Sequence, residues 1–290
     1  MDDFIYQSYI PSLGKITDLY ELKYSTFKSL VKTLLNNNNK QISLFFDKIL
    51  DNLLVEKNLE LTFFDKLYLL LTIRTICITP VLELTIPDKI NKKDNPLSID
   101  LSNIITTLKD IILPHELLHT EKTYNKIHVE YGLPVSLLTE KTENSFLTTI
   151  KRIKFNNEEV DINDPNITEL LPANIFKDCK EHFNKIEKFF ESYYLLNFKL
   201  PNEKIELNIS LADNTVLEFL KIIFKRDLLS LYEFEYYFVT KANLGSNLLH
   251  NSTPAEINVY MNLFKKEIEE RNKSNKELNM PNKGPNYKHE

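Results

Sequence analysis

Glycine is scarce in this chain, which has only four glycines among its 290 residues. Phosphate-binding loops and dinucleotide turns need glycine where the backbone approaches a ligand closely or takes a positive φ. Basic residues are not in excess either, since 36 basic and 41 acidic residues are scattered along the chain and leave a formal charge of −5. No basic stripe is present to neutralise a phosphate backbone. We therefore expect no cofactor, no small-molecule substrate and no nucleic-acid partner.

Cysteine is almost absent as well. Cys77 and Cys179 lie far apart without a CxxC or Cys/His spacing, so neither a disulfide framework nor a thiolate metal site is indicated. The first residues are acidic and lack the basic and apolar regions of a signal peptide. The longest apolar stretch, Leu67 to Ile78, is interrupted by polar residues and is too short to cross a bilayer. These features predict a protein of a reducing cytoplasm that is neither exported by the usual route nor bound to a membrane.

Residues 1–80 are predicted to be mainly helical. After an alternating stretch from Leu19 to Tyr24, which indicates a short strand, apolar residues recur at intervals of three and four. One helix is expected from Phe27 to Leu35 and a second from Ile42 to Leu54. Thr62, followed three residues later by an aspartate, is typical of a capping box, and the stretch after it is apolar on nearly every face. Such a helix belongs at the centre of a core.

The period shifts toward two between residues 81 and 168, which predicts a strand-rich middle segment. Five short alternating runs occur there: 82–86, 99–101, 127–131, 151–155 and 160–162. Asn156 and Asn157 separate the last two runs, and asparagine readily takes the turn conformations that a hairpin needs. A hairpin closed by these two asparagines is the most specific strand prediction in the segment.

Helical spacing returns in residues 169–270, and helices are predicted from Phe176 to Tyr193, from Val216 to Phe224 and from Ser230 onward, with a strand around Leu207. The last helix has a well-marked start, with Thr253 as N-cap, Pro254 at the first helical position and Glu256 completing a capping box. Its apolar stripe should dock on the body and comprises Ile257, Tyr260, Met261, Phe264 and Ile268. Residues 271–290 are polar and are expected to form a loose tail. The chain is thus predicted to be an α+β protein with helical ends around a strand-rich middle.

One motif has the form of a catalytic site, the HExxH string from His115 to His119. On a helix the two imidazoles share a face and can hold Zn²⁺, while Glu116 activates a bound water. Pro114 places the string in the first turns of a new helix, and the polar residues after it give that helix no apolar face to bury. The nearby candidates for a third ligand are generic: His128, Glu130 and Glu140. A chance match in a polar connection is therefore favoured over a metallopeptidase.

Other chemically suggestive residues are isolated. Arg74 lies within the apolar helix, where a buried charge needs a partner, and Asp65 or Glu83 could supply the carboxylate. No serine is framed by a GxSxG signature. Helix-borne aromatic residues indicate core or interface packing rather than a cofactor site. Three histidines without neighbouring ligands are expected to be exposed: His182, His250 and His289.

The stretch from Leu61 to Ile78, LTFFDKLYLLLTIRTICI, follows two helices that are opened by Tyr20–Phe27. In this order it resembles the baseplate hub family of T-even-like bacteriophages, in which a similar apolar helix precedes a β-rich segment and a helical carboxyl end. Further runs across residues 15–270 are similar to that family: Ser98–Asn103, Lys126–Pro134, Leu229–Phe238 and Thr253–Glu256. The chain departs from the family in being longer and in lacking the paired cysteines expected in some members near the first strand of the β segment.

This resemblance implies a structural or assembly component of the central hub of a contractile tail baseplate. Such a protein acts through contacts with other tail proteins and not as an enzyme, and it resides in the virion tail after assembly in the host cytoplasm. The expected interface is the last helix, around Tyr260, Phe264 and Ile268, together with the polar tail after it. Three alternatives stay open: a baseplate assembly chaperone that is absent from the virion, a zinc metallopeptidase that uses His115, Glu116 and His119, and an adaptor outside phage tails.

Overall fold

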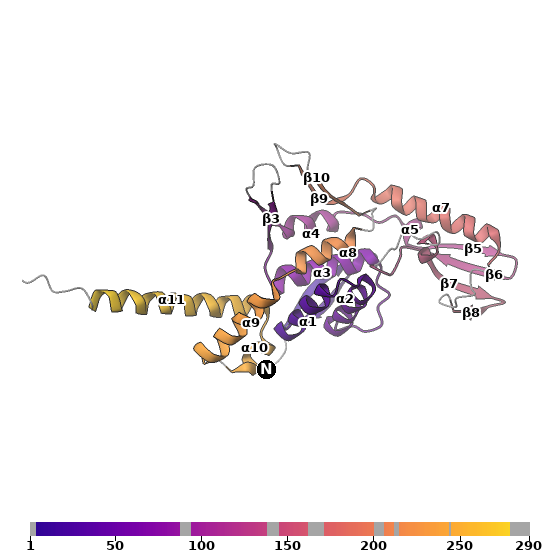
Figure 1. Cartoon of the computed structure of the whole chain (residues 1–290). Coiled ribbons are helices and arrows are strands. Elements are labelled where there is room, and N and C mark those ends of the chain that lie inside the picture. Colours follow the sequence, from indigo (N-terminus) through magenta and orange to yellow (C-terminus); the bar gives the residue numbers. More distant parts are fainter. Residues whose placement is uncertain are drawn as a thin grey trace, which may run out of the picture.

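The computed structural model describes residues 4–87, 94–137, 145–161, 171–199, 206–211, 215–243 and 245–278. It confirms a mixed α+β protein with helices in both terminal parts. In Figure 1 the N-terminal helices lie at the centre, a sheet covered by one helix lies at one end, and the last helix projects from the other end. The molecule is therefore elongated along the direction of that last helix.

The N-terminal part begins with an antiparallel hairpin of β1 (Ile5–Ile10) and β2 (Lys15–Tyr20). The strand was expected from Leu19 to Tyr24, but β2 ends at Tyr20 and so lies closer to the N-terminus. The residues after Tyr20 form a short connection, and Tyr24 is the first residue of a helix. That helix, α1 (Tyr24–Leu35), and the next one, α2 (Asn39–Leu53), follow as predicted. The side chain of Asn38 caps α2 by accepting a hydrogen bond from the backbone N–H of Gln41 at 3.1 Å.

The third helix, α3 (Phe63–Cys77), runs through the main core, as its uniform apolarity predicted. Its capping box is present: Thr62 Oγ1 accepts from the backbone N–H of Asp65 at 3.3 Å, and the Asp65 carboxylate accepts from the backbone N–H of Thr62 at 2.8 Å. The same buried carboxylate accepts from the backbone N–H and the hydroxyl of Ser12, at 2.8 and 2.6 Å. These bonds satisfy the carboxylate and tie the turn of the first hairpin to the start of the central helix.

Arg74 of α3 is also buried, with 2% of its surface exposed, but its partners are not the expected carboxylates. Its guanidinium donates to the carbonyl oxygen of Ile223, at 2.8 Å from Nε, and to that of Thr79. Ile223 lies in the last turn of α8 (Val216–Phe224), where the helix dipole favours a cation. Burial, followed by the charge of Arg226, lowers the pKa of Arg74 to about 10, so the side chain remains charged at neutral pH. The expected pairing with Asp65 or Glu83 was wrong. Every residue has a backbone carbonyl group, so the sequence does not show which of them a guanidinium binds.

The middle segment contains more helix than its period-two pattern predicted. β3 (Val81–Pro87) and β4 (Asp94–Asp100) form an antiparallel hairpin. The apolar run that continues from Ile99, however, turns into α4 (Leu101–Lys109), which the carboxylate of Asp100 caps by accepting from the backbone N–H of Ser102 at 2.9 Å. A single helical turn, α5 (His115–Leu118), follows.

A four-stranded antiparallel sheet comes next, in the order β5-β6-β7-β8. Its strands are Thr120–Tyr124, Ile127–Tyr131, Ile150–Phe155 and Glu158–Val160, and the 3₁₀ turn η1 (Ser145–Thr149) precedes β7. The β5 strand was not predicted, because it is an edge strand with mostly exposed polar side chains. The predicted hairpin between β7 and β8 is confirmed. Asn156 and Asn157 close it with positive φ values of 52° and 71°, which suit a two-residue hairpin turn.

The helix α7 (Ala173–Phe190) covers one face of this sheet, as Figure 1 shows. Its residues Ile175 and Cys179 are buried with Val129, Tyr131 and Ile153 in a small core beside the main one. Both cysteines of the chain are free and buried. The expected exposure of His182 is wrong, because this α7 residue is only 6% exposed and its ring lies 5.8 Å from that of Tyr131. His250 is exposed as predicted, and His289 lies outside the described residues.

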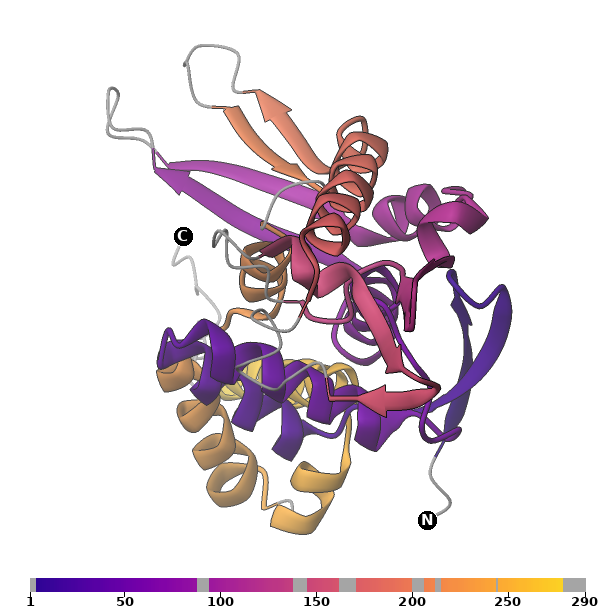
Figure 2. The same cartoon turned by 90° about the vertical axis from the view of Figure 1, so that its right-hand side faces the viewer.

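The C-terminal part returns to the main core. β9 (Tyr194–Lys199) and β10 (Glu206–Ser210) form a hairpin, and in Figures 1 and 2 it rises from the same side of the body as the β3–β4 hairpin. After α8 come α9 (Leu228–Tyr236), the π-helical turn η2 (Tyr237–Lys241), α10 (Ser246–Asn251) and α11 (Pro254–Leu278).

Two boundaries in this part differ from the predictions. The helix expected from Ser230 begins at Leu228, because Asp227 is its N-cap and accepts from the backbone N–H groups of Leu229 and Ser230 at 3.3 and 3.0 Å. The last helix continues through Leu278, into the segment for which a loose tail was expected, and residues 279–290 lie outside the described part. In the described part of the chain, no helix is both long and apolar enough to cross a membrane.

Candidate functional site

The HExxH string does not form the arrangement that a zinc peptidase requires. The helix α5 is a single turn, and His119 leaves it with extended backbone angles of φ −152° and ψ 113°. The imidazole centroids of His115 and His119 lie 6.0 Å apart, with their planes at 77°. Leu117 is the buried member of α5, and Glu116 is exposed. Within these residues there is thus no continuous, buried helix that presents both imidazoles on one face.

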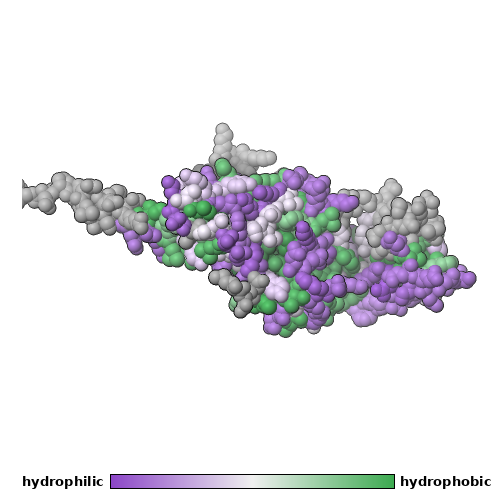
Figure 3. Space-filling view, turned by 90° about the horizontal axis from the view of Figure 1, so that it is seen from below, coloured by the Kyte–Doolittle hydropathy of each residue, from purple (hydrophilic) through white to green (hydrophobic). Residues whose placement is uncertain are grey.

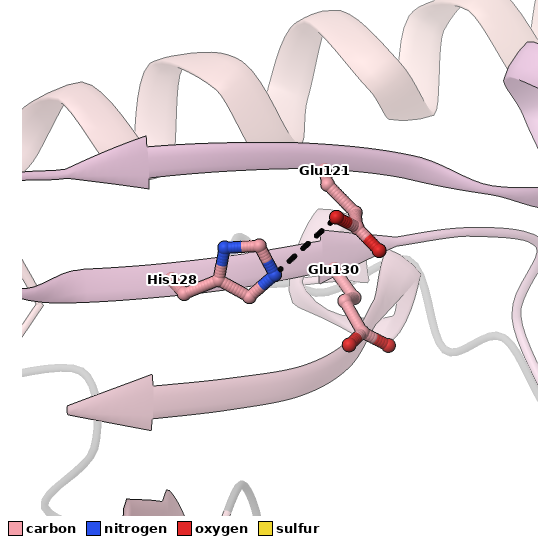
Figure 4. Close-up of side chains that lie close together, drawn as sticks. All are labelled: Glu121, His128 and Glu130. Atoms are coloured by element: carbon pink, nitrogen blue, oxygen red, sulfur yellow. Dashed lines mark ion pairs between the residues drawn. The ribbon is translucent and has the colours of Figure 1, made fainter. Parts of the chain in front are cut away.

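His119 points instead to the neighbouring sheet, where its Nε2 lies 2.8 Å from Oε1 of Glu121 on β5. The other oxygen of that carboxylate, Oε2, lies 3.6 Å from Nε2 of His128 on β6. Figure 4 shows Glu121, His128 and Glu130 side by side, and their ligand atoms all lie within 4.8 Å of one another. Two of the predicted candidates for a third metal ligand, His128 and Glu130, therefore lie together in the structure. The third member of the cluster, Glu121, was not predicted.

This cluster was hidden in the sequence for a simple reason. Glu121 belongs to the polar run after His119, which was interpreted as a connection, and only the pairing of β5 with β6 places it opposite Glu130. Strands are recognised in a sequence by the alternation of apolar and polar residues, and β5 shows little of this alternation. The remaining candidate, Glu140, lies outside the described residues.

The last helix begins as predicted, with a capping box. The backbone N–H of Thr253 donates to Glu256 Oε2 at 2.8 Å, and the backbone N–H of Glu256 donates to Thr253 Oγ1 at 3.2 Å. Ile257, one turn in, is buried, and Met261 packs against the main core.

Beyond Met261 the predicted docking of the α11 stripe on the body is wrong, because the helix projects away from the body (Figure 1). Tyr260 and Ile268 are 37% and 42% exposed, and Phe264 is partly buried. The predicted interface residues therefore lie on a helix that is anchored in its first turns, up to Met261, and is mostly exposed beyond them.

A second exposed apolar region lies on the neighbouring elements α9 and η2. No side chain of α9 is buried, whereas Phe238 of η2 is buried and its ring lies 6.0 Å from that of Tyr260 on α11. Figure 3, viewed from below, shows hydrophobic residues in green among polar ones at this end of the molecule. The exposed apolar residues of α9, η2 and α11 are termed here the terminal surface: Leu229, Tyr232, Tyr236, Tyr237, Val239, Val259, Tyr260, Leu263 and Ile268.

Only part of the terminal surface can be predicted from the sequence. The spacing of α11 predicts its apolar stripe, but the spacing after Ser230 predicts only that a helix is present. Aromatic and aliphatic side chains surround α9 on most sides, so the sequence does not tell which of them a neighbouring element covers.

A mixed α+β chain that exposes tyrosines and aliphatic residues on helices at one end has the character of a subunit that contacts other proteins. A family model described as T4 bacteriophage base plate protein matches residues 1–225. Neither curated proteins nor solved structures gave a match. Because the family match covers well over half of the chain, the chain belongs to this family and is a structural component of a phage baseplate that contacts other baseplate proteins. The matched region ends just after α8, so α9, η2, α10 and α11 lie beyond it.

Proposed function

We propose that this protein belongs to the central hub of a contractile tail baseplate and that it binds a neighbouring baseplate protein through the terminal surface. Family membership supports the baseplate role. The exposure of tyrosines on α9 and η2 supports the choice of surface, because tyrosine offers a large apolar contact area together with a polar tip and is enriched at interfaces.

The observation that carries the proposal is the exposure of α11. Along this helix Val259 and Leu263 are each 58% exposed, and Ile268 is 42% exposed. Each square ångström of apolar surface that a partner covers stabilises the complex by roughly 25 cal/mol before the costs of association. An amphipathic helix anchored only at its start is suited to lie in a groove of another protein.

The terminal surface lies outside the region that the family model matches, which supports a role for it separate from that of the matched region. The part shared with other baseplate proteins ends at residue 225, whereas the terminal surface begins at Leu229. We assign the shared part to the common baseplate scaffold and the terminal surface to recognition of this chain's own neighbour. The zinc-peptidase alternative draws no support from the geometry of His115, Glu116 and His119.

A matched pair of double variants tests the surface. Leu263→Asp with Ile268→Asp places two charges on α11, and Leu44→Asp with Ile112→Asp makes the same changes at two exposed positions elsewhere, where Leu44 is 59% and Ile112 is 87% exposed. We expect the α11 variant to lose capture of baseplate proteins from infected cells by at least about tenfold, since two charges must be desolvated at the contact. The control variant should capture them as the wild type does. Equal capture by both variants would contradict the assigned surface.

Mass spectrometry of purified virions tests the hub assignment. A hub component should be present in every particle at a fixed ratio to other baseplate proteins, and crosslinking should place it beside proteins of the tail axis. Complete absence from finished particles, together with presence in assembly intermediates, would identify an assembly chaperone instead and would overturn the hub proposal.

A further inference from the structure

Polar side chains gather on the face of the β5–β8 sheet that α7 does not cover. The register sets Glu121 directly opposite Glu130, and Thr123 directly opposite His128. Alternate residues of a strand point to opposite faces, and Val129 and Tyr131 belong to the core beneath α7. The neighbours of these two residues on β6, His128 and Glu130, therefore share the outer face with Glu121.

The two carboxylates on this face repel each other unless a cation compensates them, since like charges directly opposite in a sheet are destabilising. Arg152 on β7 lies opposite Glu130, with Nη1 at 3.6 Å from its Oε1. The same guanidinium also lies 3.2 Å from Glu159 and 3.8 Å from Glu60. One positive charge is therefore shared among three carboxylates, and the carboxylate of Glu121 is not one of them.

The other basic residue on this face is Lys154, which pairs across the sheet with His128 on one side and with Glu159 on the other. Its flexible ammonium can turn toward Glu159 and away from Glu121. The region around Glu121 and Glu130 therefore has carboxylates in excess and favours a further cation.

His128 is oriented as a metal-binding imidazole usually is. Its Nδ1 lies 3.1 Å from Thr123 Oγ1. When Nδ1 donates its proton to this hydroxyl, Nε2 presents its lone pair, and a partner of this kind fixes the tautomer of metal-bound histidines. Nε2 is 3.6 Å from Glu121 Oε2, which is longer than a hydrogen bond and leaves the two ligand atoms on either side of a gap.

We propose that Glu121, His128 and Glu130 bind a divalent transition-metal ion of the zinc class, with His119 orienting the carboxylate of Glu121 and water completing the coordination (Figure 4). Zinc ligands lie about 2.0–2.2 Å from the ion and hence roughly 3.4 Å from one another. The three ligand atoms lie within 4.8 Å of one another already. Side-chain rotations that move the ligand atoms by about 1 Å close the remaining gap. Glu121 can move most, because its side chain is 47% exposed, whereas that of Glu130 is 14% exposed and lies beside Arg152.

The proposed site is separate from the HExxH arrangement. Of that motif only His119 takes part, through its 2.8 Å contact with Glu121, and neither His115 nor Glu116 belongs to the cluster. The ion neutralises the facing carboxylates and holds β5 to β6. The inference does not depend on the hub role, because it concerns the sheet and not the terminal surface.

Isothermal titration of the tag-free, full-length protein with ZnCl₂ tests the inference. We expect about one Zn²⁺ per chain, and a loss of affinity of at least roughly tenfold in His128→Ala and in Glu121→Gln, because each removes a ligand. The matched control is His115→Ala, which removes a histidine of the HExxH motif that lies outside the cluster. This variant should bind zinc with an affinity within about twofold of the wild type.

Thermal unfolding with and without zinc gives a second readout. Zinc should raise the unfolding midpoint of the wild type and of His115→Ala but not that of His128→Ala. Glu121 and His128 lie on the outer face of the sheet and His115 is exposed on α5, so without zinc all variants should unfold near the wild-type temperature. Glu121→Gln, which keeps the shape of the residue, replaces any variant that fails to fold. Absence of zinc uptake at micromolar concentration would overturn the proposal. Loss of zinc binding in His115→Ala, with wild-type binding in His128→Ala, would also overturn it and would move the metal to the HExxH motif.

Discussion

His182 shows how burial in the small core sets the charge of one residue. Its Nε2 is buried and has no hydrogen-bond partner among the described residues. Burial, followed by the charge of Lys185, lowers the pKa of His182 below its usual value of 6.5. The folded protein therefore keeps the imidazole neutral at pH values where the unfolded chain binds a proton. His182 contributes fully to stability above pH 6.5, the pKa of the unfolded chain. This contribution is lost as the pH falls below 6.5 toward the lowered pKa of the folded protein.

The variant His182→Leu should remove this pH dependence. We expect the free energy of unfolding, measured with urea, to fall less between about pH 7.5 and about pH 5.5 in His182→Leu than in the wild type, because no buried imidazole must be kept neutral. His250→Leu is the control: His250 is exposed, and its variant should show the wild-type decrease. An equal decrease in all three proteins would show that His182 is not the titrating group.

At the residue scale, local hydrogen bonds were predictable and distant ones were not. The pairing of Thr62 with Asp65 follows from a spacing of three residues at the start of a helix. The bonds from Ser12 to the same carboxylate, and from Arg74 to the carbonyl of Ile223, join residues far apart in the chain. The fold alone brings such partners together.

Among the elements, α3 determines the main core. Phe64 is fully buried, and its ring lies 6.4 Å from Phe63 and 5.6 Å from Phe190, which comes from the end of α7. The side chain thus joins the central helix to the helix that covers the sheet. A cavity at this position affects both helices, because well-packed interiors collapse only in part around a deletion.

Phe64→Ala should therefore lower the free energy of unfolding by about 3–5 kcal/mol, measured by urea denaturation. Ile76→Ala on the same helix is the control, since Ile76 is 43% exposed, and it should lower that free energy by less than about 1 kcal/mol. Similar losses for the two variants would contradict the burial of Phe64 in the main core.

Elements were predictable where one face is apolar and another polar. The helices α1, α2, α7 and α8 have this pattern, and so does the β7–β8 hairpin with its two asparagines. α4 was missed because a strand leads directly into it, and β5 because an exposed edge strand carries few apolar residues. The metal cluster depends on β5, so it was missed with that strand.

On the scale of the whole molecule, α11 stands apart from the body. The side chains from Lys265 to Glu270 are all exposed, whereas Ile257 in the first turns is buried. The outer part of the helix therefore contributes little to the stability of the free protein. Its exposed stripe is available for a partner, which agrees with the proposed interface.

Truncation separates these two parts of the helix. A chain that ends at Glu267 should unfold within about 2 °C of the full-length protein, because no buried residue described in the structure is removed. A chain that ends at Ser252 also loses the capping box of Thr253 and the buried Ile257, and its unfolding temperature should fall clearly below both. Differential scanning calorimetry measures both changes. A large drop for the first truncation would show that the outer helix packs on the body.

The sequence is enough to predict the α+β class, the amphipathic helices, the buried central helix and the start of α11, because these depend on local spacing and capping. It also carried the resemblance to baseplate proteins that the family match confirms. The folded chain was needed to show that Arg74 binds carbonyl oxygens, that His182 is buried and that Glu121 lies beside His128 and Glu130. The physical reason is the same in each case: these contacts join side chains on different elements, and strand register and helix packing choose their partners.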